Sequence, residues 1–211
     1  IVVVNQPGAN GVTAAKAVLA APTDGYTLAM LTNGTSVSSA LAKTPAFDPV
    51  KEFVPISSLG YFDFVFVAKG DSTLKSLGDF VASAKARPGT LNIGTINVGS
   101  SQNLSAALFK SLTGIDCAIV PFRTTPDVLT ATLRGDVQLA VDGYSATKAL
   151  LADGQLKVLA SSGSQRSPSL PNVPTVKEAG VAGFEVDSWN AVFAPAGTPP
   201  AIIALLNQKL L

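Results

Sequence analysis

Residues 90–114, TLNIGTINVGSSQNLSAALFKSLTG, decide the fold, because they combine a strand pattern, a small polar loop and a helix pattern. Ile93 and Ile96 are apolar residues typical of a strand. Leu104, Leu108 and Leu112 then recur at the three- to four-residue spacing of a helix face. The stretch therefore predicts a strand that leads through its loop to a helix N-terminus.

Both ends of this expected helix carry recognisable signals. Ser100, Ser101 or Asn103 can begin it, because short polar side chains accept hydrogen bonds from the first backbone amides. Gly114 can follow its last turn. The first amides of a helix lack internal partners and lie at the positive end of the helix dipole. Gly99 has no side chain, so it would let a ligand approach the backbone. The loop is therefore a candidate anion site.

No charged side chain lies between Arg87 and Lys110. An anion held here would be bound by amides and hydroxyls rather than by a salt bridge, which favours capture and release over chemistry. The loop lacks the Gly-Lys-Ser/Thr ending of a Walker A motif, and it is not the dinucleotide-binding GxGxxG. A purely structural strand-loop-helix unit, common to all α/β proteins, remains an open alternative.

The amino-acid composition restricts the classes of function that are expected for this protein. The 211 residues are 47% hydrophobic and 14% charged with a net charge of +1, so one large or two small globular domains are expected, and nucleic acid is not an expected partner. No uncharged apolar run is long enough to cross a bilayer. The sequence contains no histidine, which excludes His-dependent catalytic triads and the commonest zinc sites. The single cysteine, Cys117, lies in an apolar run typical of a buried, inert thiol. We expect no catalytic residues, metal or cofactor.

Strand and helix patterns alternate along the chain with short connections, which predicts an α/β fold with a mainly parallel sheet covered on both faces. Residues 1–4 are an apolar run suited to a buried strand, and residues 5–11 are a turn-rich loop. Polar residues 32–36 are expected to form a second uncharged loop before a short helix. Further strands are expected at 26–31, 53–59, 61–68, 115–120, 137–141, 156–161 and 184–193, and further helices at 12–20, 74–84, 128–134, 145–152, 175–179 and 202–211.

Several short motifs occur in an order and spacing that resemble one family. They are NQPGANG at 5–11, APTDGYTL at 21–28, TNGT at 32–35, FDPVKEF at 47–53, RPGTLN at 87–92, VPF at 120–122, RSP at 166–168, LPNVPTV at 170–176, EAG at 178–180 and FAPAGTP at 193–199. Each motif is modest, but together they cover essentially the whole chain. The chain resembles the Bug receptors, the TctC-like extracytoplasmic solute-binding proteins of tripartite tricarboxylate transporters.

This resemblance implies a type II periplasmic binding protein-like fold, with two α/β lobes and a ligand cleft between them. Lobe 1 would comprise residues 1–66 and the returning segment 187–211, and lobe 2 residues 67–186. Such a receptor would be a periplasmic monomer that captures a small organic acid, an amino acid or a related molecule and delivers it to membrane permease subunits.

The resemblance also implies which residues bind the ligand. The second-lobe carboxylate loop of the family matches Gly94 to Asn103, in agreement with the anion site expected from the residues themselves, and Asn103 stands where the family commonly has histidine. Asp142 and Tyr144 occupy the stretch after a later strand, although an aspartate before a helix is also a frequent cap. The candidate contacts are Asn33, Gly34, Thr35, Thr95, Asn97, Val98, Gly99, Ser100, Ser101, Gln102, Asp142 and Tyr144.

The match has one gap. The family's first carboxylate loop, with the strand before it and the helix after it, precedes residue 1, so this part of lobe 1 is expected to be missing from the chain.

Two other functions fit the same shape. An enzyme would need a nucleophile with a base, a metal cluster or a cofactor lysine, and the sequence offers no such set. A ligand-sensing module of a signalling or regulatory system would share the fold and the binding loop, and it is the alternative to a transport receptor.

Overall fold

The computed structural model describes residues 1–6 and 11–211, so residues 7–10 of the predicted loop 5–11 lie outside the described residues. The chain divides into two compact units. Unit 1 comprises residues 1–61 and 188–211, and unit 2 comprises residues 62–187. The lobe boundaries expected from the sequence, at 66/67 and 186/187, stay a prediction.

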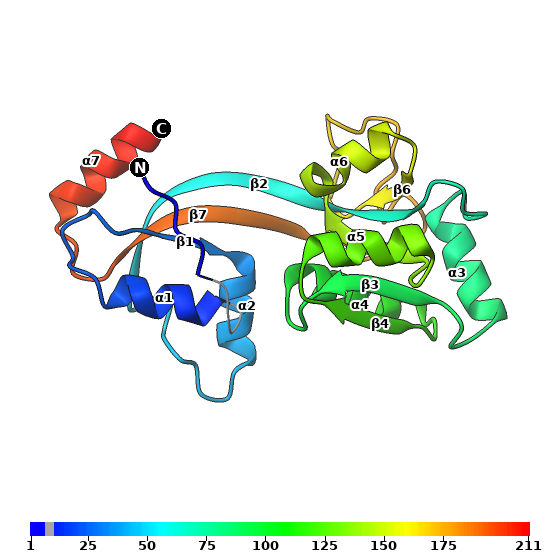
Figure 1. The fold of residues 1–211 in the computed structure, drawn as a ribbon, viewed down its shortest axis with the longest axis horizontal. Coiled ribbons are helices and arrows are strands. Elements are labelled where there is room, and N and C mark those ends of the chain that lie inside the picture. The colour runs from blue at the N-terminus through cyan, green and yellow to red at the C-terminus, as the bar shows by residue number, and fades with distance from the viewer. Residues whose placement is uncertain (7–10) are drawn as a thin grey trace. The chain divides into compact units, whose positions relative to one another are not determined.

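Unit 2 is built on a mixed sheet (Figure 1). Its strands are β2 (Phe53–Lys69, of which residues 62–69 belong to this unit), β3 (Asn92–Ile96), β4 (Ala118–Phe122), β5 (Leu139–Gly143) and β6 (Leu156–Ser161). β3 pairs in parallel with β4 and with β5, whereas β2 runs antiparallel to both β5 and β6. The expectation of a mainly parallel sheet was therefore wrong for β2, because hydrophobic periodicity does not encode the direction of pairing.

Four helices cover the two faces of this sheet: α3 (Leu77–Ala86), α4 (Ser101–Thr113), α5 (Thr125–Arg134) and α6 (Tyr144–Ala152). Side chains alternate between the faces along a strand. Accordingly, Phe64 and Phe66 of β2 pack in the cluster that includes α3 and α4, while Val65 and Val67 pack in the cluster that includes α5 and α6.

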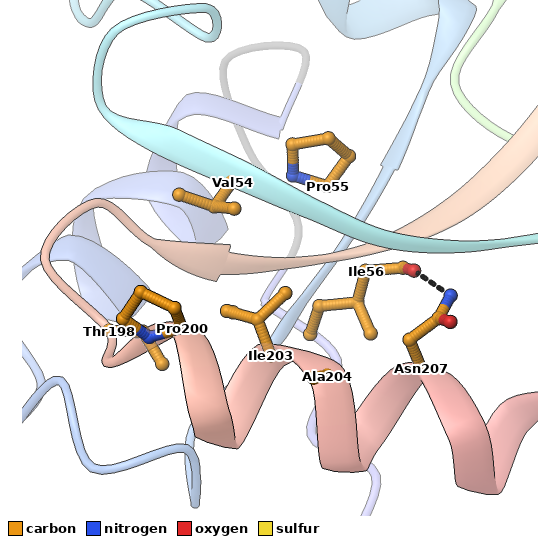
Figure 2. A pocket seen from close by; sticks show the side chains of 8 residues that line it. All are labelled: Val54, Pro55, Ile56, Thr198, Pro200, Ile203, Ala204 and Asn207. Atoms are coloured by element: carbon orange, nitrogen blue, oxygen red, sulfur yellow. Dashed lines mark hydrogen bonds between the residues drawn. The ribbon is translucent and has the colours of Figure 1, made fainter.

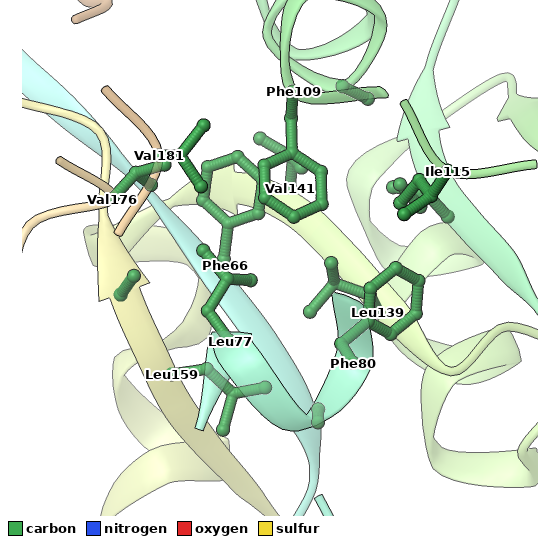
Figure 3. Close-up of a cluster of buried hydrophobic side chains, with 14 of the residues drawn as sticks. Phe66, Leu77, Phe80, Phe109, Ile115, Leu139, Val141, Leu159, Val176 and Val181 are labelled. Carbon is green, nitrogen blue, oxygen red and sulfur yellow. The ribbon is translucent and has the colours of Figure 1, made fainter. Parts of the chain in front are cut away.

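The larger cluster centres on aromatic rings (Figure 3). Phe109 of α4 lies against Phe66, Phe80 and Phe184, with ring centroids 5.3, 6.3 and 6.5 Å away. The predicted buried thiol, Cys117, belongs to the same cluster, and burial raises its pKa, as expected for an unreactive cysteine. This core fixes α4, and hence its N-terminus, against the sheet.

Unit 1 contains α1 (Val12–Leu19), β1 (Ala29–Thr32), α2 (Asn33–Leu41), the first part of β2, most of β7 (Asp187–Pro195) and α7 (Pro200–Leu210). β1 pairs antiparallel with β7, and β7 neighbours β2. Its core is a smaller apolar cluster of Ala15, Ala29, Leu31, Phe47 and Phe53.

Several expected elements differ from the structure. Residues 1–4 are exposed and form no strand, so the expectation of a buried strand was wrong. The two β-runs at 53–59 and 61–68 are one continuous strand, β2, because Gly60 does not interrupt it. Residues 175–179 form hydrogen-bonded turns rather than a helix, and the expected loop at 32–36 is the beginning of α2.

Gly94 allows α5 to pack closely on β3, and its replacement by alanine is expected to destabilise unit 2. An added Cβ would lie 2.9 Å from Cγ2 of Val137 and 3.3 Å from Cγ1 of Val128. We expect a loss of about 1–3 kcal/mol in the free energy of unfolding, measured by chemical denaturation, because inserting a methyl group overpacks the core. Gly60→Ala is the matched control, since nothing lies within 4 Å of its added Cβ. Equal stability of the two variants would contradict this account of Gly94.

Candidate functional site

Most of the contacts expected from the sequence lie in unit 2, near the carboxyl ends of the parallel strands β3 and β5. β3 leads into α4, which packs in the Phe109 cluster, whereas β5 leads into α6, which packs in the cluster on the opposite face of the sheet. The chain therefore leaves β3 and β5, which are neighbours in the sheet, toward opposite faces of that sheet. Such a switch point opens a crevice at the strand ends, where open α/β sheets bind ligands.

The loop between β3 and α4 is held by hydrogen bonds from two polar side chains. Ser100 Oγ accepts from the Asn103 amide at 3.1 Å, as an N-cap does, and donates to the Ile96 carbonyl at 3.3 Å. The sequence prediction that Ser100 can begin this helix is confirmed, and Gly114 ends it in the left-handed conformation, with a φ of 64°.

The backbone of this loop leaves room for a ligand. Gly99 has a φ of +81°, and an added Cβ there would meet no protein atom within 4 Å. The Asn103 and Leu104 amides are used by Ser100, while the Gln102 amide has no acceptor within the described residues. A hydrogen-bond donor thus lies at the N-terminus of a 13-residue helix.

A second group of polar side chains joins three elements at the same edge of the sheet. Asp142, at the end of β5, is only 3% exposed. Its Oδ2 accepts from Thr125 Oγ1 of α5 at 2.7 Å, and its Oδ1 accepts from the Gly143 amide at 2.7 Å and from Gln102 Nε2 of α4 at 3.4 Å. The buried carboxylate therefore ties together the beginnings of α4 and α5.

The predicted contacts of unit 2 differ in how accessible they are. Asn97 and Val98 are exposed, and Gly99, Ser100 and Gln102 are half-buried. Thr95 and Ser101 are 0% and 7% exposed, so their side chains lie in the interior of the fold. Tyr144 is the first residue of α6 and packs partly against the cluster that contains Val65.

The predicted contacts of unit 1, Asn33, Gly34 and Thr35, form the first turn of α2 rather than a loop. Asn33 Oδ1 accepts from Ser188 Oγ at 2.9 Å, and Thr35 Oγ1 accepts from the Thr32 amide at 3.4 Å. These contacts fix the beginning of α2 in unit 1.

Three residues of these networks were missing from the predicted site. Asn103 was noticed as a possible first residue of the helix and for its place in a motif, and a polar residue three positions after a serine cap is itself a helix-start signal. Thr125 precedes Pro126 and Asp127, a pattern typical of a helix N-terminus. For Ser188, an ordinary strand residue, the sequence carries no signal.

A separate hollow of about 450 Å³ lies within unit 1, between β2 and α7 (Figure 2). Asn207 Nδ2 donates to the Ile56 carbonyl at 2.7 Å across one end of it. No charged side chain and none of the predicted contacts line this hollow, which is formed by Val54, Pro55, Ile56, Thr198, Pro200, Ile203, Ala204 and Asn207.

Comparison with known proteins gives this geometry its context. The profile of the tripartite tricarboxylate transporter family receptor matches residues 1–210. The chain belongs to this receptor family. Its relatives include BugT of Bordetella pertussis, 32% identical over 212 residues, and a protein from the tcbD-tcbE intergenic region of Pseudomonas sp. strain P51, 28% identical over 211 residues. Both alignments cover 100% of this chain, but it spans only 65% and 63% of those relatives.

Several solved structures have the same fold. Rpa4515 of R. palustris, determined with adipate, is 34% identical with a TM-score of 0.89 over 95% of this chain and 67% of that one. MatC from Rhodopseudomonas palustris, with bound malate, is 34% identical with a TM-score of 0.84 over 96% of this chain and 69% of that one. The periplasmic binding protein BugD is 27% identical with a TM-score of 0.86, over 96% and 68%. The type II periplasmic binding protein-like α/β fold expected from the sequence is thereby confirmed.

Proposed function

We propose that this protein is a solute-binding receptor that captures a small carboxylate in the periplasm and delivers it to the permease subunits of a tripartite transporter. The observation that carries the proposal is the N-terminus of α4, where the Gln102 amide has no acceptor in the described part of the chain and where open space adjoins Gly99. Such a helix N-terminus binds an anion by its amides and dipole.

Membership of the receptor family supports this proposal. Two similar proteins of R. palustris have been solved with adipate and with bound malate, both of which are small carboxylates. Within the described residues, no helix has the length and apolarity to span a membrane, and no cluster of His, Cys, Asp and Glu is suited to a metal ion. We further propose that the protein binds its ligand without converting it. No observation favours the sensory module that was the alternative.

The side chains of the site suggest what kind of ligand contact to expect. Asn97, Val98, Gly99, Ser100 and Gln102 are the candidate contacts with exposed or half-buried positions, and none of them is charged. The proposed contact is therefore a set of hydrogen bonds from uncharged donors to one carboxylate group. We propose that Thr95 and Asp142 support these residues from the interior instead of contacting the ligand.

A thermal-shift titration tests the proposal. Malate, succinate and adipate are each compared with the corresponding diamide, which has the same shape without the negative charge. A ligand at about 100 times its Kd adds about 2.7 kcal/mol to the free energy of unfolding, so a saturable rise in Tm is expected with at least one acid. No rise with any acid, or an equal rise with the diamides, would contradict carboxylate capture.

A further inference from the structure

Both polar atoms of the Asn103 side chain make hydrogen bonds within the β3–α4 unit. Its Oδ1 accepts from the Gly99 amide at 3.3 Å, and its Nδ2 donates to Thr95 Oγ1 at 3.1 Å. The orientation of the side-chain amide follows from its partners, because only the carbonyl oxygen can accept from a backbone N–H. The side chain therefore spans from the end of β3 to the glycine that adjoins the open space.

The two hydrogen-bond partners of Asn103 differ in how deeply they are buried, and this difference indicates its role. Thr95 is fully buried, so its hydroxyl cannot reach a ligand and provides a fixed point inside the fold. Gly99, half-buried, with a φ of +81° and open space beside it, is the outer end of the connection. Ser100 joins the same loop to Ile96 at 3.3 Å, and Asn103 is the side chain that accepts from the Gly99 amide.

We propose that Asn103 is a positioning residue that holds Gly99, and with it the anion-binding shape of loop 97–100, by joining that loop to the buried Thr95. The ligand is bound by the loop, and Asn103 acts behind it. The link to ligand affinity rests on the receptor function proposed above, whereas the positioning role can be tested without any ligand.

Hydrogen exchange of the ligand-free protein tests the positioning role. In Asn103→Leu, exchange of the Gly99 amide is expected to accelerate by about tenfold, because its acceptor is lost. In Thr95→Val, the acceleration is expected to be about threefold, since the side-chain amide remains but has lost its fixed partner. The Ile93 amide within β3 should keep its rate in both variants, which separates a local change from a general loss of stability.

Asn172→Leu is the matched control, because Asn172 is exposed and lies outside this network. It should leave exchange at Gly99 unchanged. An unchanged rate at Gly99 in Asn103→Leu would overturn the proposal, as would equal acceleration at Gly99 and Ile93.

Calorimetric titration with malate, succinate and adipate then tests the effect on affinity. Asn103→Leu should weaken every acid that binds the wild-type protein by a similar factor, about tenfold, and adding Thr95→Val should cause little further loss, because the two residues form one connection. Weakening that differs among the acids, with no effect of Thr95→Val, would identify Asn103 as a direct contact and overturn the proposal. Binding of none of the acids to the wild-type protein would count against the receptor function, while the exchange result would still decide the role of Asn103.

Discussion

Replacing Phe109 by alanine is expected to lower the free energy of unfolding of unit 2 by about 3–5 kcal/mol, the largest stability effect that we predict. Phe109 is 0% exposed and lies between Phe66 of β2, Phe80 of α3 and Phe184. The truncation removes a ring that contacts three others, and neighbours on separate elements can fill the resulting cavity only in part.

The matched control is Phe62→Ala. Phe62 is 39% exposed, and its ring makes one edge-on contact with Phe64 at 5.8 Å. Chemical denaturation monitored by circular dichroism should therefore show a much smaller loss for this variant. A similar loss for both substitutions would mean that the Phe109 cluster is not the principal core of unit 2.

Replacing Gly99 by valine is expected to weaken carboxylate binding by about tenfold to a hundredfold, because the new side chain would project into the space proposed for the ligand. An added Cβ at Gly99 meets no protein atom within 4 Å, so the obstruction would be felt by the ligand. The positive φ adds backbone strain of about 1–3 kcal/mol for a non-glycine residue.

The control variant Gly114→Val distinguishes the effect of backbone strain from obstruction of the ligand. Gly114 follows the other end of α4, has a φ of +64° and has equally open surroundings. Both variants should lose comparable stability, but only Gly99→Val should raise the Kd in calorimetric titration with the acid that binds best. If Gly114→Val weakened binding equally, strain in α4 would explain the effect and the loop would not be the contact.

The sequence predicted the β3–α4 unit well because its signals are local. A serine cap, leucines at helical spacing and Gly114 all lie within one short stretch, and the structure confirms each of them. The beginning of α2 was misread because Asn33 and Gly34 are also typical of turns. Only the structure shows that Asn33 begins the helix and is held there by Ser188.

The hydrogen bonds around Asp142 could not be predicted, because its partners are distant in sequence. Thr125 is 17 positions away and Gln102 is 40 positions away. The order of β5, β3 and β4 in the sheet brings them together, and hydrophobic periodicity does not encode strand order. The sequence placed Asp142 after a strand that ended at Val141, whereas β5 extends to Gly143, and the extent of its burial required the fold.

The central claim is that the amides at the N-terminus of α4 bind a carboxylate. Its most direct test is a titration of the isotope-labelled protein with malate or adipate, followed by nuclear magnetic resonance of the backbone amides. We predict that the largest saturable shifts occur at residues 99–102, led by Gln102, and that Gly99→Val abolishes them. Shifts confined to other residues, such as Ile203 and Asn207 beside the hollow in unit 1, would contradict the claim.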